Sequence, residues 1–142
     1  MVLEDPFGIL VVDKEKGVTS HDVVAMVRRK FNIKKVGHAG TLDPNATGVL
    51  ILLLGKATKL SNSFINDDKE YEAVMKLGVR TDSGDSEGKV IAEKEPSVSE
   101  EKIKEVVLTF RGEIEQIPPM VSAKKIGGKK LYKLARLGKV VE

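Results

Sequence analysis

The stretch VGHAGTLDPNATGVLILLLG, residues 36–55, joins a glycine-rich turn to a strongly apolar run. The run over residues 49–55 has the length and composition of a central β-strand with both faces covered. In the turn before it, Asp43 lies between Gly40 and Pro44. Glycine permits backbone angles that other residues avoid, and proline fixes the chain directly after the acid. The pattern therefore predicts a tight turn that presents Asp43 from the end of a buried strand.

Asp43 has two interpretations. Its carboxylate can satisfy turn amides ahead of Pro44 in an Asx turn, and for an isolated Asp-Pro pair this is the favoured interpretation. The neighbouring His38, Thr41 and Thr47 favour the second, in which the acid faces a ligand. His38 suits either acid–base chemistry or a neutral hydrogen bond to that ligand. No second histidine or cysteine accompanies it at a ligand spacing, so we expect no metal site.

Composition narrows the class of protein. At 142 residues the chain has the size of one domain, and 41% apolar with 32% charged residues is typical of a globular protein. There is no cysteine, which excludes disulfides and thiolate chemistry. No apolar run reaches the roughly 20 residues of a membrane span, and the start of the chain lacks a signal-peptide pattern. We expect a cytoplasmic protein that does not enter a membrane.

Strand and helix patterns alternate along the chain. A β-branched run predicts a buried strand over residues 8–13. Further strand patterns cover residues 71–79 and 89–95. Capping residues and four-residue apolar spacing predict helices over residues 20–31, 57–65, 100–110 and 129–137. Thr19 or Ser20 caps the first helix, and His21 in its first turn is assigned no function. The class is mixed α and β.

Basic residues gather in two places. One cluster precedes the glycine-rich turn, and the other, without any acid, follows Ser122: Lys124, Lys125, Lys129, Lys130, Lys133, Arg136 and Lys139. Such clusters favour a polyanion, above all a nucleic acid, although each alone fits a solvated surface helix equally well. The turn at residues 81–88 is acidic, but its glycines and carboxylates are out of register for an EF-hand, so we expect an exposed turn.

Several motifs together resemble one family. GHAGTLDPNATGVL resembles the catalytic motif of the TruB family of pseudouridine synthases, which modify the uridine at position 55 of the tRNA T-loop. LVVDKEKGVTSHDVV resembles the N-terminal motif of that family, and KEYEAVMKLGVRTDSGDSEGKV a later block. FRGEIEQIPPMVSAKKIGGKKLYKLARLGK resembles its RNA-gripping thumb, at about residues 119–142. The likeness covers nearly the whole chain, from about residue 8 to residue 139.

The resemblance implies a function and roles for single residues. Asp43 matches the catalytic aspartate, which acts as nucleophile on a flipped-out uridine. Tyr71, which on its own is either a core or a cleft-facing ring, matches the tyrosine that stacks on the target base. His38 matches a histidine that contacts the RNA, and Lys124, Lys129 and Lys130 lie where the thumb contacts the RNA backbone. No cofactor or metal is implied, and a monomer that binds the tRNA T-stem-loop is expected.

The resemblance also implies a fold that this chain contains in part. It is an α+β fold with a mixed, largely antiparallel sheet and flanking helices. Family members continue into a second half of the catalytic domain, which supplies an arginine, and often into a small RNA-binding domain. We therefore expect residues 1–142 to be the N-terminal part of the catalytic domain, with the missing C-terminal part as a partner. Glu15 and Val121 depart from the family pattern, which has proline and an aromatic residue there.

Two alternatives remain from the sequence. A non-catalytic RNA-binding fragment of such a synthase is consistent with the missing half. A nucleotidyltransferase is suggested by the likeness of GTLDP to the GTFDP opening of that class. There the motif directly follows the first strand and is followed by histidines, whereas here a strand and a helix precede it.

Overall fold

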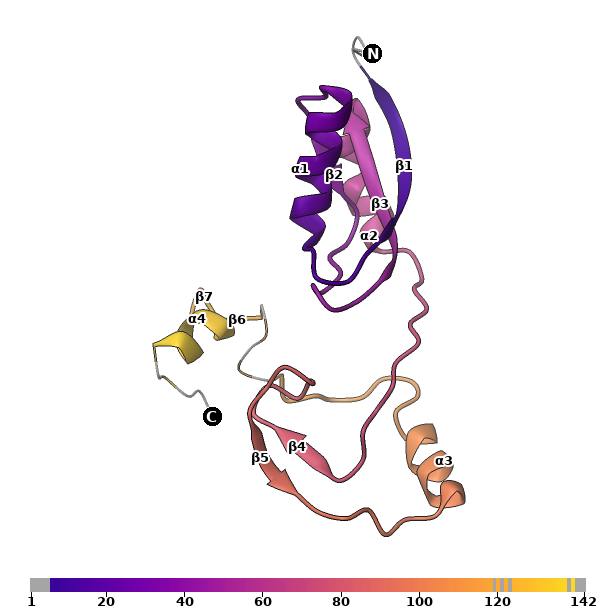
Figure 1. Cartoon of the computed structure of the whole chain (residues 1–142), viewed down its shortest axis with the longest axis vertical. Helices are drawn as coiled ribbons and strands as arrows, with labels where there is room; N and C mark the ends of the chain where they lie inside the picture. Colours follow the sequence, from indigo (N-terminus) through magenta and orange to yellow (C-terminus); the bar gives the residue numbers. More distant parts are fainter. Residues whose placement is uncertain (1–5, 119, 121, 123, 138, 140–142) are drawn as a thin grey trace. The chain divides into compact units, whose positions relative to one another are not determined.

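The computed structural model describes residues 6–118, 120, 122, 124–137 and 139. The chain divides into two compact units, Met1–Tyr71 and Glu72–Glu142. Each unit has its own helices and strands (Figure 1).

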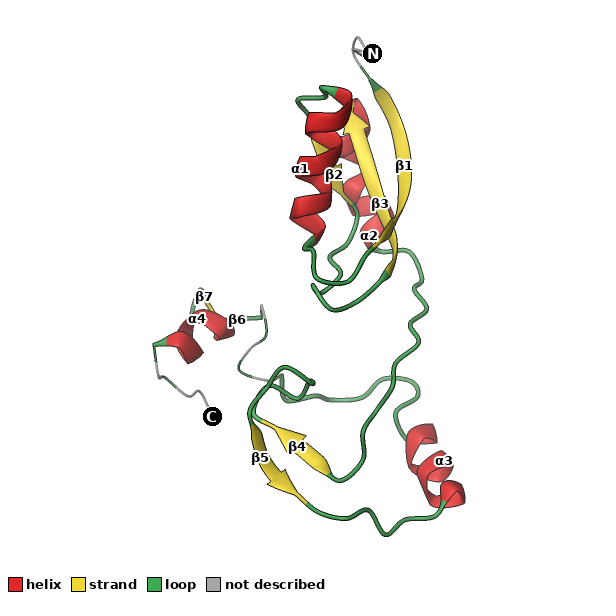
Figure 2. Ribbon diagram, viewed as in Figure 1, coloured by secondary structure: helices red, strands yellow, loops and turns green. Residues whose placement is uncertain are grey.

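A three-stranded antiparallel sheet forms the centre of the first unit (Figure 2). Its order is β1 (Phe7–Lys14), β3 (Gly48–Gly55) and β2 (Val36–His38), so the apolar run is the central strand, as predicted. The short strand β2 lies in what the sequence indicates only as a turn. It pairs with the C-terminal half of β3, where His38 faces Leu52. The loop over residues 39–47, which contains Asp43, is therefore the connection between two neighbouring strands.

Helix α1 (Ser20–Phe31) covers one face of this sheet. Thr19 is its N-cap, as predicted, and forms a reciprocal capping box with Asp22. Val23, Val24 and Val27 recur at helical spacing and pack against Leu50 and Leu52 of β3. Leu52 is completely buried. This core holds helix α1 against the middle of the central strand.

The opposite face of the sheet is covered only in part. The 3-10 helix η1 (Lys56–Leu60) and helix α2 (Ser61–Ile65) pack Ala57 and Phe64 near Leu53 and Ile51. The prediction that the first strand is buried is wrong for this face, where Phe7, Ile9 and Val11 are exposed. Successive strand residues point to opposite sides, so helix α1 covers only the alternate residues of β1.

In the second unit, β4 (Val79–Thr81) pairs with β5 (Val90–Glu93). The prediction of a strand over residues 71–79 is wrong except at its end, because residues 71–76 have no regular structure. Val74 of this stretch is 99% exposed. The alternating pattern alone does not make a strand, which needs a neighbouring strand for its backbone hydrogen bonds. The acidic turn between β4 and β5 is exposed, as predicted.

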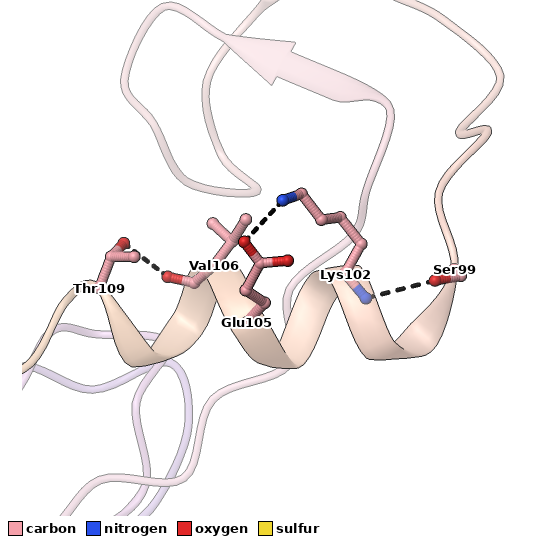
Figure 3. Close-up of polar contacts among 5 residues, drawn as sticks. All are labelled: Ser99, Lys102, Glu105, Val106 and Thr109. Atoms are coloured by element: carbon pink, nitrogen blue, oxygen red, sulfur yellow. Dashed lines mark hydrogen bonds and ion pairs between the residues drawn. The ribbon is translucent and has the colours of Figure 1, made fainter.

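Helix α3 (Glu100–Leu108) is stabilised by local contacts (Figure 3). Ser99 is its N-cap and accepts a hydrogen bond from the backbone N–H of Lys102, at 3.3 Å. The Lys102 ammonium lies 2.7 Å from the Glu105 carboxylate, and Thr109 donates to the Val106 carbonyl at the end of the helix. The predicted helix is confirmed and ends two residues early.

The last elements are a short hairpin, β6 (Lys125–Ile126) and β7 (Lys129–Lys130), and helix α4 (Leu131–Arg136). The helix predicted over residues 129–137 therefore begins two residues later, and Lys129 and Lys130 belong to a strand. The hairpin turns at Gly127-Gly128, both with positive φ. Part of the predicted thumb, residues 119, 121, 123, 138 and 140–142, lies outside the described residues.

Candidate functional site

The loop between β2 and β3 carries Asp43 at the surface of the first unit. The loop leaves the sheet at Ala39, whose N–H donates to the Ile51 carbonyl at 2.9 Å. Gly40 has a φ of +117°, which glycine adopts without strain. Asp43 is exposed, whereas the Leu42 side chain before it packs against the core. An exposed acid is thus flanked by residues that hold the loop to the sheet.

Asp43 begins a β-turn. The Ala46 N–H donates to the Asp43 carbonyl at 3.0 Å, and Pro44 occupies the second turn position, which suits its fixed φ. In the part of the chain that the structure describes, the Asp43 carboxylate receives no hydrogen bond and forms no ion pair. The backbone therefore closes this turn without the side chain. The Asx-turn interpretation is wrong, and the carboxylate is available to a ligand.

Lys14 holds the loop from the side of β1. Only 1% of its surface is exposed, and its ammonium donates to the carbonyls of Glu15, Val18 and Pro44 at 3.0, 2.9 and 3.2 Å. The Pro44 carbonyl also accepts the Gly17 N–H at 2.8 Å. Three carbonyl dipoles thus surround the buried charge. No signal in the sequence indicates this role of Lys14, because lysines are common where a strand ends in a surface turn.

His38 is half-buried at the end of β2. Its Nδ1 lies 2.6 Å from the Gly40 carbonyl oxygen, which can only accept, so Nδ1 carries the proton. In the neutral ring Nε2 is then the acceptor. The ring of His21 meets that of His38 edge-on, with centroids 6.0 Å apart and planes at 81°. A histidine without a sequence-assigned role therefore lies beside one with a predicted role.

Tyr71 does not join this group. It is the last residue of the first unit, lies in a stretch without regular structure and is 69% exposed. Among the described residues no ring contact or hydrogen bond connects Tyr71 to Asp43 or His38. Of the three residues predicted around the target base, His38 and Asp43 thus lie at and after the end of β2, and Tyr71 lies elsewhere in the first unit.

The three predicted RNA-contacting lysines lie at the hairpin of the second unit. Lys124 and Lys129 are exposed, and the Lys124 carbonyl accepts the Leu131 N–H. Lys130 faces Lys125 across the hairpin, and its ammonium lies 5.6 Å from the centre of the Tyr132 ring. Neighbouring strand residues point to opposite faces, so Lys129 and Lys130 present their charges on different sides. Facing like charges repel, which an anionic ligand would relieve.

The described residues contain no group of three or more His, Asp or Glu side chains arranged to hold a metal ion. The acidic turn binds its own backbone instead. Asp85 Oδ1 accepts hydrogen bonds from the Ser83 hydroxyl and from the Glu87 and Gly88 amides, and these bonds lower the pKa of Asp85. Within the same described part of the chain, no helix is long and apolar enough to cross a membrane.

Similarity to known proteins places the chain in one class, the pseudouridine synthases. A family model described as "TruB family pseudouridylate synthase (N terminal domain)" matches residues 28–142. The chain belongs to this family. The α+β fold class expected from the sequence is confirmed by the same comparisons.

Curated relatives support membership of this family. Proteins named tRNA pseudouridine synthase B from Alkaliphilus oremlandii and Protochlamydia amoebophila are 53% and 54% identical over 95% of this chain. The aligned part is 45% and 52% of those proteins, so the chain spans about half the length of the curated relatives it matches.

Two solved structures share the fold. A chain of a Cbf5-Nop10-Gar1 complex is 34% identical with a TM-score of 0.58, over 84% of this chain and 31% of that one. A chain of an H/ACA RNP bound to a substrate RNA containing 2'-deoxyuridine is 33% identical with a TM-score of 0.53, over 79% and 30%.

Proposed function

We propose that the protein containing this chain isomerises uridine to pseudouridine at position 55 in the T-loop of tRNA, with Asp43 as the nucleophile. The single observation that carries the proposal is the exposed Asp43 carboxylate on a pinned loop, unbonded among the residues that the structure describes, in a member of the TruB family. The relatives named tRNA pseudouridine synthase B support tRNA as the substrate. We infer a cytoplasmic location from that substrate.

The chemistry suits a carboxylate. The bond between ribose C1′ and base N1 breaks, the base turns, and C1′ bonds to C5. The proton on C5 is lost and N1 gains one, so the product is an isomer and the balance requires no redox cofactor. A carboxylate can attack C1′ or stabilise an electron-poor sugar, as in glycoside hydrolysis. Asp43 can do this only if the uridine is turned out of the RNA stack.

The other predicted residues have supporting roles in this proposal. The free Nε2 of His38 accepts a hydrogen bond from RNA close to the flipped nucleotide, and Tyr71 stacks on the target base. Lys124, Lys129 and Lys130 contact the RNA backbone from the hairpin. The repulsion between Lys125 and Lys130 supports this last role, because phosphates would neutralise it.

We also propose that residues 1–142 form the N-terminal part of the catalytic domain, with a thumb at about 119–142, in a monomeric enzyme. The exposed apolar residues Phe7, Ile9 and Val11 support a further part of the protein that covers this face of the sheet. Membership of the family leaves the nucleotidyltransferase alternative without support. The remaining alternative is that this chain is an RNA-binding fragment without activity. It is consistent with the chain spanning only about half the length of its relatives.

Tritium release from tRNA labelled at C5 of uridine tests the proposal. We expect release by the whole gene product from wild-type transcripts, and none when uridine 55 is replaced by cytidine. Asp43→Asn abolishes release while tRNA binding stays within about threefold of wild type. Asp68→Asn, another exposed aspartate of the first unit, is the matched control and retains activity. Release by Asp43→Asn at the wild-type rate would remove Asp43 from its role. Turnover by residues 1–142 alone would exclude the inactive-fragment alternative.

A further inference from the structure

The Ser20 hydroxyl bonds twice to the residue directly before Asp43. Ser20 is only 2% exposed, although it begins a helix at the surface of the sheet. Its Oγ accepts the Leu42 N–H at 3.0 Å and donates to the Leu42 carbonyl at 3.3 Å. One side chain thus contacts both backbone polar groups of Leu42.

These two bonds restrict the backbone that leads to Asp43. The Leu42 N–H and carbonyl belong to successive peptide planes, and the second plane contains the Asp43 Cα. A group that holds both planes fixes the dihedral angles between them. On the other side of Asp43, the Pro44 carbonyl is held by Lys14 and Gly17. The exposed carboxylate is therefore placed by contacts to its two neighbours.

Ser20 is itself rigidly placed. It lies inside the capping box of Thr19 and Asp22, and the next turn of α1 packs Val23 and Val24 into the core. Hydroxyl groups on a packed helix are held more closely than those on a loop. The helix cap thus fixes the Ser20 hydroxyl, the hydroxyl fixes the Leu42 backbone, and that backbone fixes the position of Asp43.

We propose that Ser20 is a positioning residue for Asp43, a role that rests on the proposed function. Ser20 does not touch the RNA in this scheme; it keeps the carboxylate within reach of ribose C1′. Misplacement of a reacting group by about 1 Å can reduce a rate about 100-fold. We expect Ser20→Ala to reduce the single-turnover rate on tRNA by about 10- to 100-fold, with an unchanged dissociation constant for tRNA.

Two further variants separate positioning from stability. Val27→Ala weakens the same helix about two turns from Ser20 and leaves the Ser20 hydroxyl in place, so it should keep the wild-type rate. Ser20→Thr keeps the hydroxyl and should recover the rate to within about threefold of wild type. Independently of activity, hydrogen exchange of the Leu42 amide should be at least about tenfold faster in Ser20→Ala than in wild type or Ser20→Thr.

The outcomes distinguish this proposal from the proposed function. All assays use the whole gene product that contains residues 1–142. A wild-type protein without tritium release overturns the proposed function, and the role of Ser20 with it. An active wild type with an equally fast Ser20→Ala variant overturns the role of Ser20 alone. So does a Ser20→Thr variant that protects the Leu42 amide but is as slow as Ser20→Ala.

Discussion

Replacing Lys14 by methionine removes the buried charge beside the loop and leaves a side chain of similar length. Three hydrogen bonds from the ammonium are lost, to Glu15, Val18 and Pro44. The Pro44 carbonyl still accepts the Gly17 N–H, so we count only the other two. At about 1–1.5 kcal/mol for each partly buried carbonyl, the free energy of unfolding falls by about 2–3 kcal/mol. With roughly 4 °C for each kcal/mol, the Tm falls by roughly 10 °C.

The assay is thermal unfolding at neutral pH followed by circular dichroism, repeated in urea. Lys16→Met is the matched control, because Lys16 lies in the same turn but is exposed, and its Tm should change by less than about 2 °C. Hydrogen exchange of the Gly17 amide should also become faster in Lys14→Met. A Tm within about 2 °C of wild type for Lys14→Met, or an equal fall for Lys16→Met, would refute this account.

Three further predictions concern the first unit. Gly55→Ala should leave little folded protein in a urea titration, because a Cβ there collides with the Pro6 carbonyl oxygen at a φ of +57°; a midpoint near wild type contradicts this. Leu52→Ala removes a fully buried side chain and should lower the free energy of unfolding by about 3–4 kcal/mol in the same titration, and a loss under about 1 kcal/mol would contradict this. The Thr19 hydroxyl and N–H lower the pKa of Asp22 below 3.8, so its stabilising effect is present above that pH and is lost as the pH falls through the lowered pKa. The stability difference between wild type and Asp22→Asn should therefore narrow from pH 7 to pH 3, and a constant difference would exclude the carboxylate as its source.

The local elements of the first unit could be predicted because their signals are local. Thr19 caps α1 through contacts within four residues, and the apolar run around Leu52 can form only a covered strand. The strand expected from Tyr71 onward could not be predicted correctly. Its alternating residues satisfy the pattern, but strand formation depends on a partner elsewhere in the chain.

The predicted site shows the same division. His38 and Asp43 are only five positions apart in one motif, so sequence proximity alone places one at the end of a strand and the other on the loop that follows. The contact between His21 and His38 joins residues from a helix and a strand, so no local pattern reveals it. For the same reason, the basic cluster after Ser122 is visible as charge, while the pairing of Lys125 with Lys130 depends on the hairpin.

By itself, the sequence determined the mixed class, the central strand, the capped helix and the position of Asp43 in a glycine-rich turn, because each depends on neighbours along the chain. Only the tertiary structure decided that the Asp43 carboxylate is unbonded in the described part of the chain, and that Lys14 and Ser20 hold the residues on either side of it. Hydrogen bonds that span 22 and 30 residues depend on how α1 and the sheet pack together, and packing is a property of the whole unit.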